Sequence, residues 1–494
     1  MKLAAVLWAA GAIASAAPPA ETLRCKDCSV ILISVTNLRY DHVSSNGYFR
    51  PTTPSLDALA AESLVFSNTF AQASWTLPGG ISMFTGLYPF SHGVMNRTPG
   101  TRLPDKTRTL IDLLNQKGYR TAAFTGGFDY DPHWGLTSRF SHYEECKNTL
   151  SPAGGPPGPD YYGEFRCAVP KALEWLEGVR DKKFFLFLQS FDAHCPFGQD
   201  KGELYDTDYK GTVDFGRCLL TFEKTQPDVK DGLPYYSIKF QPKPGAAFTG
   251  TAVLGPEDVR HLIALYDEDV TFADKEIGRF LKQVKALGLE EKTIIIVTSE
   301  HGDMFGKHGR FMRGGPVRGT LYDDVIHVPL MIRHPKLRAR RVDALVEQID
   351  LMPTLASALA LKPRAPLQGK NLGPAILEGR ELHDYIFAGS GYDPGKSNGA
   401  FKNRSRIEAI RDKRYKLIRE TVFEATGPVR QTEFYDILAD ADEMHDISGQ
   451  ALPVQAEMLK RLDERSAALF PLSRGGRERP SAGSSERLSR SAGP

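Results

Sequence analysis

Residues 293–303 read TIIIVTSEHGD, an apolar run followed directly by four polar or ionisable residues, Ser299, Glu300, His301 and Asp303. The run is rich in β-branched side chains and shows no polar alternation, which is typical of a strand covered on both faces in a parallel sheet. Ligands of open α/β sheets bind beyond the carboxyl ends of the strands. The residues that follow this run therefore predict one side of a functional site.

Other segments are also apolar runs without polar alternation. Apolar runs of similar length occupy residues 30–35, 121–125, 184–191 and 328–332. Helical patterns lie between them at 109–117 and at 256–287, where apolar residues recur at spacings of three and four. Strands that alternate with helices predict a doubly wound, mostly parallel α/β sheet flanked by helices.

The pattern changes after residue 375. Alternating polar and apolar residues at 406–410, 414–418 and 433–437, with a helical pattern near 455–468, predict a small C-terminal antiparallel α+β subdomain at 376–472. The large α/β domain then spans 29–375. Within it, residues 198–255 are rich in Gly, Pro and Asp and predict an insertion or lid.

Both termini have biased compositions. Lys2, an apolar run over 3–13 and the small residues Ala14-Ser15-Ala16 predict a signal peptide at 1–16, hence export to the periplasm or the medium. A membrane anchor is the weaker alternative, because a span needs about 20 apolar residues. No membrane span is predicted after signal removal. The tail at 473–494 contains mainly Arg, Gly, Ser and Pro, and we expect it to be disordered.

The six cysteines permit disulfides in an exported protein, but the sequence leaves their pairing open. For the CxxC formed by Cys25 and Cys28, a local disulfide or a pair of thiols is favoured over a redox or metal site. The chain has 494 residues, with Lys+Arg 62 against Asp+Glu 60 and a net charge of +2. Such a balance provides no overall field for nucleic acid. The oligomeric state is not indicated.

Three strand ends carry the polar residues of the predicted site, and the first is the run at 293–298 that leads into Ser299. Residues 30–35 run into Thr36 and Asn37, and residues 184–191 run into Asp192 and His194. A fourth piece is the sequence around Thr76, where Thr76 is a good N-cap and Pro78 suits the first helical turn. A helix start favours an anion, and a hydroxyl there could attack phosphorus or sulfur if a metal lowered its pKa. The alternative is that Thr76 is only a cap.

Several motifs in order resemble the sulfatases of the alkaline phosphatase superfamily. They are SVTNLRYDHVSSNGYFRPTTPSLDALAAESLVFSNTFAQASWTLPGGISMFTGLYPFSHGV at 34–94, FLQSFDAHCPF at 187–197, TIIIVTSEHGDMFGKHG at 293–309, QIDLMPTL at 348–355 and RDKRYKLIR at 411–419. The resemblance covers about residues 29–450. It implies a large α/β domain, a small C-terminal sheet and a metal-assisted esterase centre.

The sequence departs from this family's pattern at the reactive positions, so the chain resembles an atypical member. Family members hold a divalent cation with paired acidic residues after the first strand, where this chain has Thr36 and Asn37. Sulfatases convert a Cys or Ser in a Cys/Ser-x-Pro-x-Arg context into formylglycine. Here that segment reads Thr76-Leu77-Pro78-Gly79-Gly80, and Thr cannot become formylglycine.

The resemblance implies a set of site residues. The catalytic set is Thr76 as nucleophile, His194 as proton donor, His308 as an ester contact and Arg318 as a clamp on the nonbridging oxygens. The metal set is Thr36, Asn37, Glu300 and His301, which would hold one divalent cation. Only one of these four is a carboxylate, so zinc or manganese suits the set better than calcium. The alternative is that the metal has been lost.

Two main functions remain open. The first is an exported sulfatase-like hydrolase that acts on a sulfate or phosphate ester by metal-assisted attack, with Thr76 at the nucleophile position. The second is a catalytically degraded sulfatase-fold protein that binds an anionic ligand, such as a small anionic ester or a sulfated or phosphorylated glycan. A structural or partner-binding role is a third alternative. The sequence favours an enzyme without naming its substrate.

Overall fold

The computed structural model describes residues 21–97, 100–146, 164–195, 197–198, 204–211, 218–219, 227–242, 250–313, 320–392 and 404–469. The predicted signal peptide and the predicted C-terminal tail lie outside these residues. Within the described part of the chain, no helix has the length and apolar content needed to cross a membrane.

An eight-stranded sheet forms the centre of the large domain, in the order β12-β2-β11-β10-β1-β5-β3-β4. Its strands are β1 (Ser29–Val35), β2 (Leu64–Phe70), β3 (Arg120–Thr125), β4 (His142–Glu145), β5 (Phe184–Ser190), β10 (Thr293–Thr298), β11 (Leu330–Arg333) and β12 (Arg340–Glu347). β1 lies between β10 and β5 and runs parallel to both. Their carboxyl ends are therefore neighbours at one edge of the sheet.

The strand predicted at 328–332 exists as β11, but it runs antiparallel to both of its neighbours. Burial on both faces gives it the same apolar sequence as a parallel strand, so direction is not encoded in that pattern. The sheet is consequently mixed and mostly parallel.

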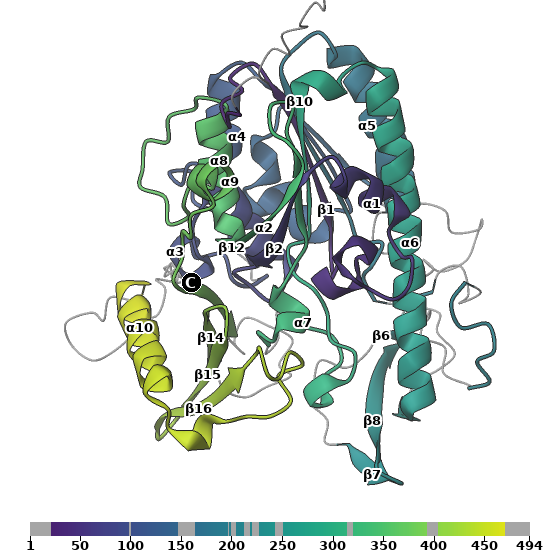
Figure 1. Ribbon diagram of the computed structural model, residues 1–494, viewed down its shortest axis with the longest axis vertical. Coiled ribbons are helices and arrows are strands. Elements are labelled where there is room, and N and C mark those ends of the chain that lie inside the picture. The colour runs from purple at the N-terminus through teal and green to yellow at the C-terminus, as the bar shows by residue number, and fades with distance from the viewer. Residues whose placement is uncertain are drawn as a thin grey trace, which may run out of the picture.

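Helices cover both faces of this sheet (Figure 1). One face carries α1 (Pro54–Ala60), α5 (Phe165–Val179) and α6 (Pro256–Ala286); the other carries α2 (Thr76–Thr85), α4 (Leu110–Gln116), α8 (Leu351–Ala358) and α9 (Gly373–Glu378). Successive residues of β1 point into opposite apolar clusters, with Ile31 on the α6 side and Leu32 on the α2 side. This arrangement confirms the predicted doubly wound α/β fold.

Local sequence sets the helix limits. Thr109 caps α4, because its side chain accepts from the Asp112 backbone N–H while the Asp112 carboxylate accepts from the Thr109 backbone N–H. Pro256 opens α6, where a missing N–H costs nothing. Both helices lie within a residue or two of the predicted ranges.

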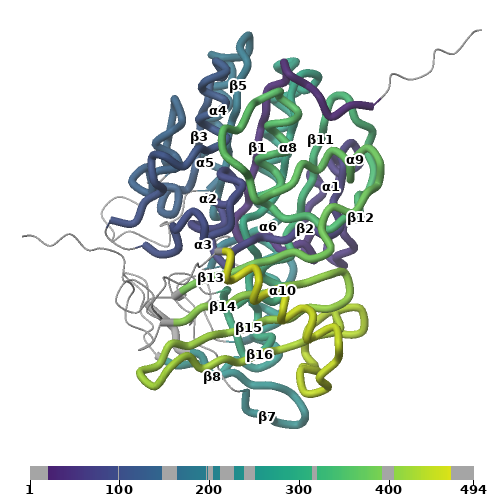
Figure 2. Tube along the Cα trace, turned by 90° about the vertical axis from the view of Figure 1, so that its left-hand side faces the viewer, coloured from purple at the N-terminus to yellow at the C-terminus, as the bar shows by residue number. Residues whose placement is uncertain are grey.

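A second sheet of four antiparallel strands lies in the C-terminal part. It consists of β13 (Ile386–Tyr392), β14 (Arg404–Arg411), β15 (Tyr415–Glu424) and β16 (Gly427–Asp436), and α10 (Pro453–Leu469) packs on it through Met458 and Leu462. The predicted α+β arrangement of this part is confirmed. The turned view places this sheet below the main sheet (Figure 2).

The predicted insertion contains a small antiparallel sheet of its own. Its strands are β6 (Cys218–Leu219), β7 (Asp228–Lys230), β8 (Leu233–Pro242) and β9 (Gly250–Leu254). Two disulfides join Cys25 to Cys28 and Cys146 to Cys167. The CxxC is thus a local disulfide.

Candidate functional site

The polar residues after β1 and β10 meet as the sequence predicted. Thr36 Oγ1 lies 3.1 Å and 3.2 Å from the two carboxylate oxygens of Glu300. Asn37 Nδ2 donates to Asp303 Oδ2 at 2.5 Å, and Asn37 adopts a left-handed backbone with φ 71°. Asn tolerates this conformation better than most residues do. The ends of two neighbouring strands are therefore joined through buried side chains.

Thr76 and His301 form a hydroxyl–imidazole pair, with 3.0 Å between Thr76 Oγ1 and His301 Nε2. The other ring nitrogen, Nδ1, lies 2.8 Å from the carbonyl oxygen of Gly302. A carbonyl can only accept, so Nδ1 carries the proton and Nε2 accepts from the Thr76 hydroxyl. Burial, together with the charge of Arg313, holds the pKa of His301 well below its usual value. A neutral imidazole thus presents its lone pair to Thr76.

The start of α2 places Thr76 differently from the prediction. The helix begins at Thr76 itself, and Trp75 occupies the N-cap without a side-chain cap. The predicted capping role of Thr76 is therefore wrong, because its hydroxyl bonds to His301 instead. Close packing continues along this turn: a Cβ at Gly80 would lie 2.5 Å from the hydroxyl oxygen of Tyr130.

Two residues that the sequence analysis missed complete the surroundings of Glu300. Tyr130, from a 3₁₀ turn at Phe128–Tyr130, donates to Glu300 Oε1 at 2.6 Å. Gln189, in β5, donates to Thr36 Oγ1 at 2.8 Å. Burial raises the pKa of Glu300, although the Tyr130 hydrogen bond acts against that rise. No motif marked Tyr130, because the contact depends on the fold of a loop far away in the sequence.

Arg313 is a third missed residue, and it contacts His194. His194 Nδ1 lies 2.5 Å from the carbonyl oxygen of Cys195, so Nδ1 carries the proton and Nε2 accepts from Arg313 Nη2 at 2.7 Å. Arg313 Nη1 lies 3.7 Å from Asp303 Oδ2. Burial and the nearby Arg313 hold the pKa of His194 well below its usual value. In this arrangement His194 positions Arg313 and has no proton on Nε2 to donate.

The remaining predicted residues lie elsewhere. His308 stacks on Tyr322, with 3.7 Å between ring centroids and an interplanar angle of 4°. Arg318 lies outside the described residues. Another basic side chain that follows His308 in the chain, Arg313, lies in the site and contacts His194.

We tested whether the predicted metal set suits a divalent cation. Asn37 Oδ1 is buried and has no hydrogen-bond partner among the described residues, so one oxygen is available. Glu300, the only carboxylate of the set, already accepts from Tyr130 and Thr36, and His301 Nε2 accepts from Thr76. A hard cation wants roughly six to eight oxygen ligands and more negative charge. These residues therefore do not fit a hard divalent cation such as Ca²⁺, and Arg313 adds a positive charge beside them.

A separate buried cluster brings the ligand atoms of Glu347, Asp350 and His383 within 4.8 Å of one another. Its carboxylate oxygens already have protein donors. Glu347 accepts from the Tyr88 hydroxyl at 2.6 Å and the Phe387 N–H at 2.8 Å, and Asp350 Oδ2 lies 2.9 Å from His383 Nε2. Burial would lower the pKa of His383, but the Asp350 hydrogen bond raises it. This cluster joins the large domain to β13.

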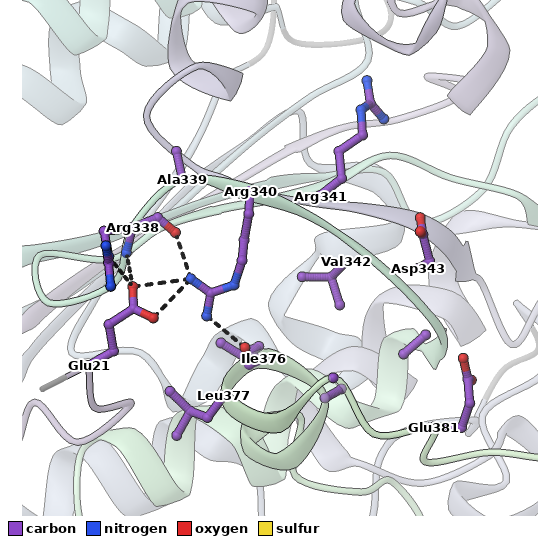
Figure 3. Close-up of a pocket in the computed structure, with 13 residues that line it drawn as sticks. Glu21, Arg338, Ala339, Arg340, Arg341, Val342, Asp343, Ile376, Leu377 and Glu381 are labelled. Carbon is purple, nitrogen blue, oxygen red and sulfur yellow. Dashed lines mark hydrogen bonds and ion pairs between the residues drawn. The ribbon is translucent and has the colours of Figure 1, made fainter.

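One cavity lies away from all these groups. It has a volume of about 670 Å³ and lies between β12 and α9 (Figure 3). Arg338 and Arg340 line it, and both pair with Glu21. Arg340 is paired with Leu64 at the start of β2, so the cavity opens at the amino ends of the parallel strands. No predicted site residue lines it.

Comparison with known proteins identifies the family of this chain. The sequence model of the family described as Sulfatase matches residues 29–361. The chain belongs to the sulfatase family. A second match, to the C-terminal domain of N-sulphoglucosamine sulphohydrolase, covers residues 306–468. Sulfatases typically use a metal ion, so the donor set found here departs from the family.

Individual sulfatase-family relatives are distant in sequence and similar in fold. An ulvan-active sulfatase of Formosa agariphila is 24% identical over 438 residues, with 84% of this chain and 76% of that protein covered. The phosphonate monoester hydrolase of Agrobacterium radiobacter has a TM-score of 0.66 at 22% identity, covering 90% and 95%. A structure in complex with its substrate D-glucosamine-2-N,6-O-disulfate has a TM-score of 0.67 at 19% identity, covering 90% and 99%.

Proposed function

We propose that this sulfatase-family chain hydrolyses a sulfate or phosphate ester, with Thr76 at the nucleophile position and His301 as its general base. The 3.0 Å contact between Thr76 Oγ1 and His301 Nε2 carries this proposal. The sequence shows no activator next to Thr76 and predicts activation by a metal. His301 supplies one in space, oriented by Gly302, which is the arrangement of a nucleophile, a base and an orienting group.

In the proposed reaction, the bonds and protons balance without an added cation. Thr76 Oγ forms a bond to sulfur or phosphorus while its proton passes to His301 Nε2, and the bond to the ester oxygen breaks. The leaving alkoxide takes a proton from solvent. Water then attacks the same centre and releases a proton to solvent. The bond to Thr76 breaks, and His301 returns its proton to the threonine oxygen.

Three relatives support the proposed substrate class. An ulvan-active sulfatase and a protein solved with a glucosamine disulfate both support a sulfated glycan, whereas the phosphonate monoester hydrolase keeps phosphorus esters in the set to be assayed. The N-terminal end of α2 and the Arg313 guanidinium favour the anionic group of either ester. Attraction of the anionic group therefore does not depend on the net charge of the protein, which is +2.

Export forms part of the proposal. It rests on the predicted signal peptide at 1–16 and on the two disulfides, Cys25–Cys28 and Cys146–Cys167, which persist in oxidising compartments. N-terminal sequencing of the protein recovered outside the cytoplasm should begin at Ala17. A full-length chain that stays inside the cell would contradict this part.

A binding function without turnover is the second candidate. It is favoured by Thr36 and Asn37, which replace the expected carboxylates, and by the complete burial of Thr76 and His301, both 0% exposed. Such a protein would keep the anion pocket and bind a sulfated or phosphorylated glycan.

The decisive test uses two variants of one residue. We would assay the purified mature chain on aryl sulfate, aryl phosphate and phosphodiester substrates, beside Thr76→Val, which keeps the shape, and Thr76→Ser, which keeps the hydroxyl. We expect Thr76→Val to lower kcat/KM by about 10³-fold or more and Thr76→Ser to retain measurable turnover. Turnover that survives Thr76→Val would exclude Thr76 as nucleophile. Anion binding without turnover by the wild type would establish the second candidate.

A further inference from the structure

The guanidinium of Arg313 is buried but only partly bonded. Its residue is 5% exposed, and it follows β10 through the loop that also carries Asp303. Of its three nitrogens, Nη2 donates to His194. Nε and Nη1 donate no hydrogen bond to any described residue, and the 3.7 Å between Nη1 and Asp303 Oδ2 is an ion pair rather than a hydrogen bond.

Such an arrangement is costly unless an acceptor arrives. A buried charged donor without a partner loses its hydration and gains nothing in return. The planar fork of an arginine matches two oxygens of a tetrahedral oxyanion, and it carries its charge at every physiological pH. The unpaired edge of Arg313 therefore points to an anionic ligand with at least two free oxygens.

We propose that Arg313 provides, as a fixed side-chain cation, the positive charge that a divalent ion provides in metal-dependent sulfatases, so that this site binds its oxyanion without metal. The proposal rests on the proposed function only for the identity of the ligand as a sulfate or phosphate ester. Arg313 lies close to the residues that stand where a metal would otherwise be bound. Its ion-pair partner Asp303 is bonded to Asn37, one of the two neutral residues after β1.

The charge states of the other site residues are consistent with Arg313 as the cation of the site. Both histidines near Arg313 are neutral: Nδ1 of His194 and Nδ1 of His301 each donate to a carbonyl, and their other nitrogens accept. Each carboxylate already has a neutral or cationic donor, Tyr130 and Thr36 for Glu300, and Asn37 for Asp303. A divalent ion would have to displace these donors and lie close to a like charge.

The first experiment uses the wild-type chain. We would titrate inorganic sulfate and inorganic phosphate into the full mature protein by calorimetry, once in EDTA and once with calcium, manganese or zinc, and measure bound metal by elemental analysis. We expect the same Kd, within about 2-fold, in EDTA and with each metal, and less than stoichiometric metal. Anion binding that disappears in EDTA and returns with a metal would overturn the proposal, as would failure to bind either anion.

Variants then assign the charge to Arg313. We expect Arg313→Met to weaken anion binding by about 10- to 100-fold in EDTA, since two charge-assisted hydrogen bonds are lost, and Arg313→Lys to restore part of it. Arg102→Met is the matched control, because its side chain is 53% exposed and pairs with Asp105. Unchanged affinity in a folded Arg313→Met protein would overturn the proposal. The wild-type titration decides the matter if that variant does not fold.

Thr76→Val separates this inference from the proposed function. Metal-independent binding by Thr76→Val, with turnover lost, would support both. Metal-independent binding by a wild type that turns nothing over would support Arg313 and reject the hydrolase. Turnover that requires an added metal would reject the inference while leaving the role of Thr76 intact.

Discussion

Among the described residues, two of the buried groups of histidine and carboxylate are built in opposite ways. Around His301 and Arg313 the histidines are held neutral, and Arg313 and Asn37 keep buried polar atoms without hydrogen bonds to described residues. Around His383 the two carboxylates accept donors from Tyr88, Phe387 and His383, and the pKa of His383 is raised.

Such a difference is expected between a ligand-binding site and a cluster that stabilises the fold. Satisfied buried networks rigidify a fold, whereas unsatisfied polar groups cost stability and persist where function needs them. A search for acid and histidine clusters alone would select the Glu347 group as the metal site. Buried polar atoms without a hydrogen bond to a described residue mark the Arg313 group, although such atoms also occur at Arg411 and Arg419.

Replacing the base should give the largest effect. We expect His301→Gln to lower kcat/KM by about 10²- to 10⁴-fold, because Gln keeps polarity but cannot take the proton of Thr76. Since the pKa of His301 is lowered, the imidazole stays neutral as pH falls through about 6.5, and the acid limb of the wild-type pH profile should lie below that value. Steady-state kinetics across pH measure both. A loss no larger than that of His133→Gln, an exposed control, would contradict the base role.

Breaking the satisfied cluster should affect stability rather than turnover. We expect His383→Leu to lower the free energy of unfolding by about 3–5 kcal/mol, because two buried carboxylates lose their cationic partner. The pKa values of His383 and Glu347 are both raised, so the folded cluster binds more protons than the unfolded chain does.

By linkage, this stabilisation is present at low pH and is lost as pH rises through the folded pKa values, about 7 for Glu347 and above the usual range for His383. Urea denaturation at several pH values measures it, with His445→Leu, an exposed histidine, as the control. A difference between wild type and His383→Leu that grew with pH would contradict this account.

Removing the unsatisfied charge should have the smallest effect on stability. We expect Arg313→Met to lower the free energy of unfolding by less than His383→Leu does, by about 1–2 kcal/mol, because it loses one hydrogen bond and the 3.7 Å ion pair with Asp303 but also removes two donors that are unbonded among the described residues. The same urea experiment measures it. A loss as large as that of His383→Leu would mean that both clusters are structural and that the comparison is wrong.

The sequence alone predicted the part of the site that parallel strands align. Thr36 and Asn37 after one strand, and Glu300 and His301 after its neighbour, met as expected, because parallel strands in register deliver their carboxyl ends to one edge. The family resemblance located Thr76 at the same place. These inferences needed only strand identity and chain order.

Other features depend on tertiary contacts that no local pattern records. Tyr130 reaches Glu300 from a 3₁₀ turn, and Arg313 reaches His194 across an irregular loop, so neither has a periodicity to detect. The direction of β11 was missed for a related reason, since burial alone sets its composition. The N-cap of α2 is Trp75, one residue before the predicted Thr76, and the Thr76 hydroxyl bonds to His301 instead.

The close approach of Tyr130 to Gly80 restricts which residues can stand at position 80. Gly80 stands at the arginine position of the formylglycine motif, and any side chain there would collide with the Tyr130 hydroxyl, 2.5 Å from the Cβ position. That tyrosine is in turn bonded to Glu300. An Arg at position 80 would require Tyr130 to move or change, and a change at Tyr130 would remove the hydrogen bond that it donates to Glu300. The two positions are therefore coupled, so a substitution at Gly80 alone is disfavoured.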